Sequence, residues 1–457
     1  MPLIASISGI RGVFGNGLDP AVLTRYAAAF GGWCREQSDD EKPTVVVGRD
    51  GRATGEICSR IVTATLQACG CNVIDAGLAT TPTVAMGVLE SNASGAVILS
   101  ASHNPAEWNA LKLLNAKSEF LSPEEATTVI EMAEKEPSAY TVPHQKTGSY
   151  TEQDFLDVHI QRILELPYIQ SETIRTRNFK VVVDGINSVG GFALPALLQA
   201  LGVKEVDVLN GTCNGQFAHN PEPLPENIEG ILNHVRDTGA DIGLVVDPDV
   251  DRLAFVENGG RFFGEELTQV VAADFLMRKQ PGPFATNLSS SRAIDDVMAK
   301  YDQPVYRSAV GEINVVKKMQ EVGAVLGGEG NGGVILPALH YGRDALAGTA
   351  FVLQHLAETG KSLSEIRAGL PKYHIAKHKL PLPDGVNPDK LLERVAEQFV
   401  GEKISTVDGV KIDFADSWVH LRKSNTEPIL RIYTEASAEK EANDLAERFK
   451  KVLTDAI

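Results

Sequence analysis

The sequence predicts an α/β protein with three similar mixed α/β domains followed by a C-terminal α+β domain. Short Val- and Ile-rich runs alternate with helix-like patterns through most of the 457 residues, and this alternation starts three times along the chain. After Leu370-Pro371 the pattern changes to several strands followed by one helix. A chain of this length has room for several domains, roughly three at about 150 residues each.

The first two repeats are the clearest. In the first, strands are expected at 44–48, 72–75 and 96–99, with helices at 56–68 and 83–89. The second has a strand at 180–184, a helix after Gly190-Gly191 and a strand at 241–246. Strand-helix alternation of this kind predicts covered, largely parallel sheets.

The third repeat and the C-terminal region follow. The third contains a helix at 265–279, a strand at 283–286 and a further element at 320–326. The last region contains strands at 409–413, 417–421 and 429–433 and a helix at 438–453. The polar stretch 134–151, which holds two prolines, is predicted to be a linker. We therefore expect domains at 1–150, 151–253, 254–371 and 372–457.

Composition limits the class of protein. The net charge of −17 argues against a nucleic-acid partner, because a phosphate backbone is held by basic surface. The five cysteines are an odd number without a repeated metal-ligand spacing, which favours reduced thiols. The N-terminus lacks a basic segment followed by an apolar stretch, and no run approaches the ~18 apolar residues of a membrane span. We therefore expect no membrane association and a cytoplasmic location.

Polar side chains follow the predicted strand at 96–99. The segment Ser100-Ala-Ser-His-Asn-Pro105 lies at the carboxyl end of that strand, where open α/β sheets bind ligands. The hydroxyl of Ser102, beside His103, could carry a phosphoryl group. The alternative is a polar turn whose side chains satisfy backbone groups. Lys112 could place an ammonium near the phosphoryl group, or it could be a solvated surface charge.

A second segment, Asp247-Pro-Asp-Val-Asp-Arg252, offers three carboxylates at alternate positions. Carboxylates about 4 Å apart would repel by about 4 kcal/mol at an effective dielectric of 20, and a cation such as Mg²⁺ removes that penalty. A calcium loop of the EF-hand kind is excluded, because Arg252 stands at its sixth position and Asn258 at its twelfth. The remaining alternative is a loop with exposed aspartates. Arg252 could pair with a phosphate or with one of the aspartates.

Two later segments suit a phosphorylated sugar. Gly327-Gly-Glu-Gly-Asn-Gly-Gly333 has the spacing of a dinucleotide-binding loop, but the strand-like 334–336 follows instead of a helix, which excludes that site. Its glycines allow close approach to a ligand, and Glu329 and Asn331 could bind sugar hydroxyls. The segment 420–428 combines basic and small polar side chains, which suits a phosphate dianion, although such a loop by itself is usually a turn.

Taken together, these segments resemble the α-D-phosphohexomutase family, which includes phosphoglucomutases, phosphomannomutases and phosphoglucosamine mutases. The resemblance runs the whole length in the family's motif order. Ser8-Gly-Ile-Arg-Gly12 resembles the segment whose arginine lies near the phosphoserine. The serine segment resembles the phosphoserine loop, the aspartate segment the Mg²⁺ loop, the glycine-rich segment the sugar-binding loop, and 422–426 the phosphate-binding loop.

The resemblance implies four domains around a central cleft and a Mg²⁺-dependent phosphohexomutase, with one Mg²⁺ per chain and a hexose 1,6-bisphosphate as activator. Phosphorylated Ser102 would donate its phosphoryl group to a hexose monophosphate and later recover the other phosphate. The catalytic residues implied are Ser102, Arg11, His103 and Lys112, and the metal ligands are Ser102, Asp247, Asp249 and Asp251. The substrate-binding residues implied are Arg252, Glu329, Asn331, Arg422, Ser424, Asn425, Thr426 and Arg431.

The chain departs from the family pattern in two places. Many members have a histidine, a candidate general base, directly after the sugar-binding loop, where this chain has Gly333. The base is therefore open between Lys112, His103 and another group such as His340. The loop also reads Glu-Gly-Asn-Gly in place of the commoner Glu-x-Ser-Gly, so Asn331 could contact substrate differently.

The substrate expected is glucosamine phosphate. Ser308-Ala-Val-Gly-Glu-Ile313 resembles the Thr-x-Val-Gly-Asp segment typical of phosphoglucosamine mutases, and Glu312 could favour an amino sugar. A phosphoglucomutase/phosphomannomutase of dual specificity is the second hypothesis. A non-catalytic sugar-phosphate binding protein and a phosphatase are further alternatives. Hexose phosphates are the partners expected, and monomer and homodimer both remain open.

Overall fold

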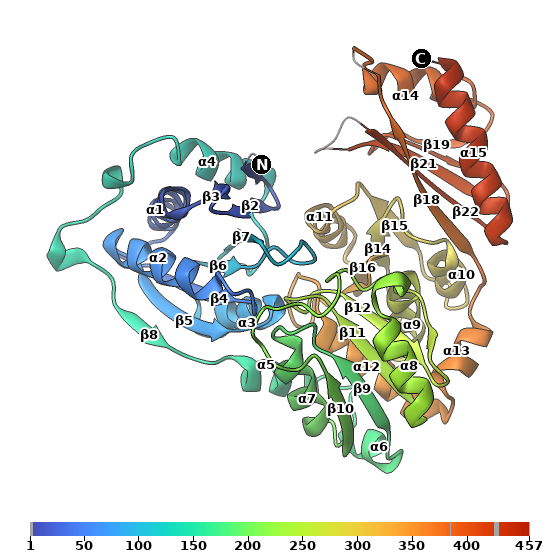
Figure 1. Cartoon of the computed structure of the whole chain (residues 1–457), viewed down its shortest axis with the longest axis horizontal. Coiled ribbons are helices and arrows are strands. Elements are labelled where there is room, and N and C mark those ends of the chain that lie inside the picture. The colour runs from blue at the N-terminus through green and yellow to red at the C-terminus, as the bar shows by residue number, and fades with distance from the viewer. Residues whose placement is uncertain (1–2, 384, 425–428, 457) are drawn as a thin grey trace. The chain divides into compact units, whose positions relative to one another are not determined.

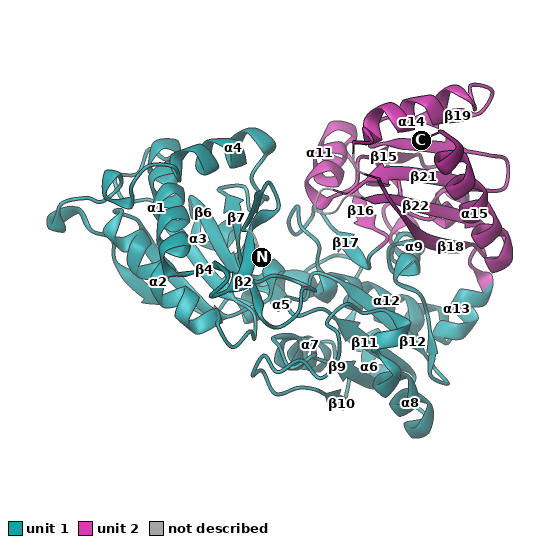
Figure 2. Cartoon of the chain, turned by 45° about the horizontal axis from the view of Figure 1, so that its top comes forward, with its two compact units in different colours: residues 1–275, 331–368 teal, residues 276–330, 369–457 magenta. Residues whose placement is uncertain are grey.

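The computed structural model describes residues 3–383, 385–424 and 429–456. The chain forms two compact units, which Figure 2 shows in different colours. Unit 1 comprises residues 1–275 and 331–368, and unit 2 comprises residues 276–330 and 369–457. Ser102, the predicted phosphoserine, and residues 247–252, the predicted metal-binding loop, all belong to unit 1.

The N-terminal part of unit 1 is a mixed sheet with strand order β1-β2-β7-β6-β4-β5-β8, with β3 beside β2. Its central strands β5, β4 and β6 are parallel, whereas β7 runs antiparallel to β6 and β2. The strands are β1 (Ile4–Ser6), β2 (Gly9–Phe14), β3 (Gly17–Leu18), β4 (Thr44–Arg49), β5 (Asn72–Leu78), β6 (Gly95–Leu99), β7 (Trp108–Asn115) and β8 (Tyr150–Glu152). The helices are α1 (Pro20–Gln37), α2 (Gly55–Ala68), α3 (Thr81–Ser91) and α4 (Pro123–Met132), with short 3-10 turns η1 (Pro137–Ala139) and η2 (His144–Lys146).

Alternation along the strands gives this sheet two apolar faces. Val45 and Val47 of β4 join a core formed with α1, α2 and α4, whereas Val46 between them joins a second core formed with α3. Figure 1 labels these four helices and strand β4. Successive side chains of a strand point to opposite faces, so a continuous Val run requires helices on both sides. The strand ends, which helices leave uncovered, are therefore the places where polar loops can gather.

The second sheet of unit 1 has the order β10-β9-β11-β12-β13. Strands β9 and β11 are parallel, and β11 pairs with β12 antiparallel so that Val246 lies opposite Leu253. The aspartate segment is therefore the loop of a β-hairpin. The strands are β9 (Lys180–Asp184), β10 (Glu205–Leu209), β11 (Ile242–Val246), β12 (Leu253–Glu257) and β13 (Arg261–Phe262).

The other elements of unit 1 pack around this sheet. Ile231 and Val235 of α8 share a core with β9, β11 and β12, and α7 covers β9 and β10. The helices are α5 (Leu156–Leu164), α6 (Ser171–Thr176), α7 (Gly190–Ala200), α8 (Glu229–Thr238), α12 (Ala345–Thr359) and α13 (Leu363–Gly369), with the 3-10 turn η3 (Pro225–Asn227) and strand β17 (Gly333–Ile335). Helix α9 (Glu265–Met277) extends to the boundary with unit 2.

Unit 2 contains a parallel arrangement of β15, β14 and β16 and a fully antiparallel C-terminal sheet, β18-β22-β21-β20-β19. Leu391 of α14 and Phe449 of α15 pack with the apolar face of this last sheet. The strands are β14 (Phe284–Asn287), β15 (Val305–Ser308), β16 (Leu326–Glu329), β18 (His374–Pro381), β19 (Lys403–Ser405), β20 (Val410–Asp413), β21 (Trp418–Lys423) and β22 (Ile429–Ala436). The helices are α10 (Ala293–Ala299), α11 (Glu312–Val322), α14 (Pro388–Glu397) and α15 (Glu439–Ala456).

The structure adds detail to three of the expected features. The first two sheets are mixed, because hairpin partners such as β7 and β12 return antiparallel. The expected linker 134–151 holds η1 and η2, and its last two residues begin β8, which pairs in parallel with β5. The segment 320–326 is the end of α11 and the start of β16. In the part of the chain that the structure describes, no helix is both long enough and apolar enough to cross a membrane.

Candidate active site

Ser102 lies just after β6 in a strained turn. Its φ of 50° is in the left-handed region that non-glycine residues rarely adopt. The turn is held because the Ser102 N–H donates to Oγ of Ser100 at 2.9 Å. Its hydroxyl donates to Oδ2 of Asp247 at 2.6 Å, and Nδ1 of His103 lies 3.4 Å from Oγ of Ser102. The serine is thus brought to the aspartate loop, and the motif is more than a polar turn.

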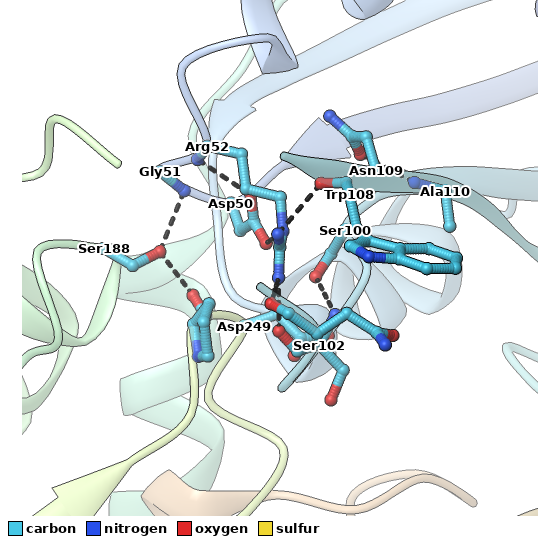
Figure 3. A network of polar contacts seen from close by, with 12 residues as sticks. Asp50, Gly51, Arg52, Ser100, Ser102, Trp108, Asn109, Ala110, Ser188 and Asp249 are labelled. Carbon is cyan, nitrogen blue, oxygen red and sulfur yellow. Dashed lines mark hydrogen bonds and ion pairs between the residues drawn. The ribbon is translucent and has the colours of Figure 1, made fainter. Parts of the chain in front are cut away.

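Arg52, after β4, shapes this loop from within (Figure 3). Its side chain is buried, and its Nε donates to Oδ2 of Asp50 at 3.1 Å. The rest of the guanidinium donates to four main-chain carbonyls, those of Ser102 (2.5 Å), Asn104 (2.7 Å), Pro105 (2.6 Å) and Trp108 (2.9 Å). The planar guanidinium group of Arg52 therefore satisfies main-chain carbonyls of this loop that are not paired in a β-sheet.

Ser188 connects this loop region to the aspartate hairpin within unit 1. Its Oγ accepts from the backbone N–H of Gly51 at 2.9 Å and donates to the carbonyl of Pro248 at 2.5 Å (Figure 3). Thr81, at the start of α3, makes a second connection. Its N–H donates to the carbonyl of Asp249 at 2.9 Å, and its hydroxyl donates to the carboxylate of the same residue. The relative positions of serine and aspartates are therefore fixed on both sides.

The three aspartates are fully buried, so the reading of an exposed acidic loop is wrong. Each offers one carboxylate oxygen to a group whose atoms lie within 4.8 Å of one another. Oδ1 of Asp249 and Oδ1 of Asp251 are buried and have no hydrogen-bond partner among the described residues. A group of three buried carboxylates in which two oxygens lack a partner in the described part of the chain fits a hard divalent cation such as Mg²⁺.

The hairpin that carries them is strained. Val250 has φ 62°, an outlier for a β-branched side chain that costs about 1–3 kcal/mol. Its N–H donates to the Asp247 carbonyl at 3.0 Å, and its own carbonyl accepts from Ala345 N–H at 3.3 Å. Oδ1 of Asp247 accepts from the N–H groups of Asp251 and Arg252 at 3.2 and 3.1 Å. The backbone conformation thus serves to turn the carboxylates toward one point.

Cationic side chains surround the carboxylates, and two of them, Lys112 and Arg343, are buried. Lys112 on β7 is not a surface charge, since its Nζ lies 2.5 Å from Oδ2 of Asp249 and 3.6 Å from Oδ2 of Asp251. Arg343 donates to that oxygen of Asp251 at 2.6 Å. Nη2 of Arg11 on β2 donates to the Ser8 carbonyl at 3.0 Å. Nη1 of Arg252 lies 3.4 Å from Oε1 of Glu222.

These charges shift the pKa values of two of the aspartates in opposite directions. Burial and the two neighbouring carboxylates raise the pKa of Asp247 well above its usual range. Burial alone would also raise the pKa of Asp249, but the ammonium of Lys112 and its hydrogen bond lower it. Burial would lower the pKa of Lys112, yet Asp249 and Asp251 raise it above its ordinary value. Lys112 is therefore held as a cation in this arrangement.

The two histidines considered as bases differ. Burial, with the charges of Arg252, Arg11, Arg343 and Lys112, lowers the pKa of His103 to about 2, so its imidazole is neutral. His340 is buried elsewhere in unit 1. Its Nε2 lies 3.3 Å from Oδ2 of Asp344, the carboxylate that caps α12.

The sugar- and phosphate-binding predictions fall mainly in unit 2. Glu329 is buried, and its Oε1 accepts from Asn287 at 3.0 Å. The N–H of Ser424 donates to the Ile429 carbonyl at 3.0 Å. Asn331, at the edge of unit 1, accepts from the N–H of Gly333 at 3.2 Å. Asn425 and Thr426 lie outside the described residues.

Arg422 and Arg431 are direct partners across β21 and β22, and Lys379 of β18 lies opposite Arg431 on its other side. Nη2 of Arg422 forms an ion pair with Oδ2 of Asp408 at 3.1 Å. Like charges opposite one another on a sheet are unfavourable unless an anion compensates them. This row of three cations therefore suits a phosphate dianion.

Sequence reasoning missed Arg52, Arg343 and Lys379. Arg52 has a weak local signal, the acid-Gly-Arg turn 50–52 directly after a predicted strand. Lys379 falls outside the strands that the sequence predicted, and Arg343 is 92 residues from the carboxylate that it contacts. Neither has a pattern that reveals its partner.

Four models of known protein domains match the chain in order. They describe the three α/β/α domains and the C-terminal domain of phosphoglucomutase/phosphomannomutase, and they match residues 4–140, 157–260, 263–373 and 379–452. The chain belongs to the phosphoglucomutase/phosphomannomutase family. The predicted α/β fold class and the predicted phosphotransferase enzyme of this family are both confirmed by these matches.

Individual members of the family support the same assignment. A phosphoglucomutase/phosphomannomutase of Thermococcus kodakarensis is 36% identical, with 98% of each chain covered. A phosphoglucosamine/phosphogalactosamine mutase of Sulfurisphaera tokodaii is 30% identical and covers 97% of this chain and 98% of its own. The crystal structure of a family protein from Burkholderia thailandensis superposes with a TM-score of 0.87 at 27% identity, covering 99% of this chain and 97% of its own. Family members therefore differ in the sugars for which they are named.

Proposed function

We propose that this enzyme interconverts a hexose 6-phosphate and a hexose 1-phosphate through phosphorylated Ser102 and a bound 1,6-bisphosphate. The observation that carries the proposal is the 2.6 Å contact between Oγ of Ser102 and Oδ2 of Asp247, beside two buried carboxylate oxygens that lack partners among the described residues. A nucleophilic oxygen and a cation site at this separation suit phosphoryl transfer.

The transfer starts with the phosphoryl group on Oγ of Ser102. The bond from phosphorus to Oγ breaks, a new bond to the free sugar hydroxyl forms, and the hydroxyl proton passes to a base. After the bisphosphate turns over, Oγ takes the other phosphoryl group and the proton returns to the sugar oxygen. Catalysis then depends on positioning and charge neutralisation.

The residues divide this work. Asp247, Asp249 and Asp251, with an oxygen on Ser102, would hold one Mg²⁺, which when bound neutralises charge on the phosphoryl oxygens. Arg11, Lys112 and Arg252 supply further positive charge. Of the candidate bases, His103 is neutral and next to Ser102, whereas Lys112 is held protonated. A phosphoryl dianion on Ser102 would offset the cations around His103 and increase its basicity.

Glucosamine phosphate is the substrate that the segment Ser308–Ile313 favours. Glu312 begins α11, in the same unit as Glu329 and the row of Lys379, Arg431 and Arg422. An acidic side chain could recognise the ammonium of an amino sugar. Glucose and mannose phosphates are the second candidates, because the relative with 36% identity is named for them.

A phosphorus NMR time course tests both levels of the proposal. The full chain is incubated with Mg²⁺, a trace of hexose 1,6-bisphosphate as activator, and the 6-phosphate of glucosamine, N-acetylglucosamine, glucose or mannose. We expect a 1-phosphate signal, fastest with glucosamine. Faster conversion of glucose or mannose keeps the mechanism and rejects the substrate, whereas free phosphate or no change rejects the mutase.

Glu312→Gln tests the basis of the substrate assignment. The variant keeps the size and hydrogen-bonding capacity of the side chain but removes its charge. We expect the ratio of glucosamine to glucose activity to fall several-fold while glucose activity is kept. An unchanged ratio shows that Glu312 does not read the amino group.

A further inference from the structure

The side chain of Arg343 occupies the space beside Gly333, where many family members have a histidine. Arg343 lies between β17 and α12, where it forms an isolated antiparallel bridge with Ile335. A Cβ added to Gly333 would lie 2.2 Å from Cδ and 2.8 Å from Cγ of Arg343. The aliphatic part of the arginine therefore lies directly across the glycine, and no larger residue fits at 333 unless the arginine moves.

The backbone that carries Arg343 is firmly held. The N–H of the next residue, Asp344, donates to the Val334 carbonyl at 2.8 Å. Oδ1 of Asp344 caps α12, and its Oδ2 lies 2.9 Å from Nε2 of His159 and 3.3 Å from Nε2 of His340. These groups are all buried. The side chain of Arg343 thus starts from a fixed point and is aimed at the aspartate hairpin.

The guanidinium ends on a proposed metal ligand. Nη2 of Arg343 donates to Oδ2 of Asp251 at 2.6 Å, and the two side chains are 9% and 0% exposed. Lys112 lies 3.6 Å from the same oxygen, while Oδ1 of Asp251 has no partner among the described residues. Two cationic side chains therefore compensate the charge of Asp251 at Oδ2, whereas Oδ1 is available to a divalent cation.

We propose that Arg343 is a positioning residue of this site, which shares Asp251 with the divalent cation and adds a fourth positive charge for the phosphate dianion beside Arg11, Lys112 and Arg252. The inference rests on the proposed function. Its two parts have opposite consequences. A guanidinium on Asp251 weakens cation binding, since like charges repel, but it strengthens binding of a phosphorylated sugar.

Arg343→Met separates these effects, because methionine keeps an unbranched apolar stem without charge. Mg²⁺ binding is measured by titration calorimetry on the full chain without sugar, and KM and kcat are measured with the best hexose 6-phosphate. We expect Mg²⁺ to bind at least about threefold more tightly, while KM for the sugar rises at least about threefold. Arg343→Lys, which keeps the charge, should restore much of the sugar affinity.

Gly333→Ala provides an independent test, because its methyl group displaces Arg343 without deleting it. The variant should also tighten Mg²⁺ binding, and combining it with Arg343→Met should add nothing further. Gly230→Ala on α8 is the matched control, since a Cβ there has nothing within 4 Å, and Mg²⁺ binding should not change.

A purely structural role for Arg343 predicts a different result. Mg²⁺ and sugar would then both bind more weakly, together with a lower melting temperature, and that outcome rejects the proposal, as does unchanged binding of both. If the wild-type chain lacks mutase activity, the proposed function fails. The Mg²⁺ titrations of both variants still decide whether Arg343 competes with the cation.

Discussion

The hydroxyl of Ser102 donates to the carboxylate of Asp247 at 2.6 Å across a sequence separation of 145 residues. The serine follows a parallel strand of one sheet, and the aspartate opens a hairpin of another. Arg52 and Ser188 hold the two loops in this relationship from behind. The proposed reacting oxygen and the proposed cation site are thus already close together without a ligand, which would reduce the reorganisation that phosphoryl transfer requires.

Ser102→Ala should abolish mutase activity, because it removes the oxygen that we propose carries the phosphoryl group. The loss should be at least about 10³-fold in kcat, with the fold retained by circular dichroism. Ser437→Ala, an exposed serine that bonds Glu441, is the control and should keep full activity. A Ser102→Ala enzyme with normal turnover would falsify the phosphoserine assignment.

Lys112→Met should destabilise the protein in a way that Mg²⁺ repairs. Removing the ammonium leaves Asp249 and Asp251 buried without it, which costs about 3–5 kcal/mol when a buried pair is broken. Thermal unfolding with and without millimolar Mg²⁺ should show a lower melting temperature that rises more with the cation than in wild type. Lys117→Met, exposed beyond the end of β7, should show neither effect. If the melting temperature of Lys112→Met falls but does not rise more with Mg²⁺ than that of wild type, the cation site is contradicted.

Arg52→Lys should reduce kcat about 100-fold with a smaller change in KM. Lysine keeps the charge but cannot donate to four carbonyls in one plane, and a shift of about 1 Å in the Ser102 loop is enough for that loss. Steady-state kinetics measure the effect, with exposed Arg60→Lys as the control. If Arg52→Lys is as active as wild type, the fork does not set the loop.

Lys379→Ala should raise KM for the hexose phosphate about three- to tenfold and leave kcat nearly unchanged, because it removes one cation from the row with Arg431 and Arg422. Loss of like-charge repulsion should leave stability equal or slightly higher. Lys403→Ala, exposed on the edge strand β19, is the control for a change in net charge. An unchanged KM excludes Lys379 from the phosphate site.

His420 should make stability depend on pH. Burial lowers its pKa to about 4 from an ordinary value of 6.5, although its bond to the Asp408 carbonyl acts against the shift. Folding favours the neutral form, so stability is full above pH 6.5 and is lost as pH falls toward 4, by about 3 kcal/mol in all. Melting curves of His420→Gln should lose that part of the pH dependence, and exposed His374→Gln should not. Equal slopes for wild type and His420→Gln reject this assignment.

The sequence alone identified the candidate site residues that lie together in short motifs. Ser102 and the three aspartates stand in short motifs that follow apolar strands, and strand ends are where such loops must lie. Lys112 was ambiguous because a lone lysine has no pattern, and its burial decided the matter. Arg52 and Lys379 were missed, since their roles depend on carbonyls and on cross-strand partners that only folding brings near.

By itself the sequence determined the order of α/β units, the distinct C-terminal sheet and the two halves of the proposed transfer site, because periodicity and local motifs carry that information. The tertiary structure alone decided which charges meet. Arg343 reaches Asp251 because Gly333 has no side chain to exclude it and because Asp344 anchors α12 beside it. Such contacts join distant parts of the chain through packing and electrostatics, and neither leaves a periodic trace in sequence.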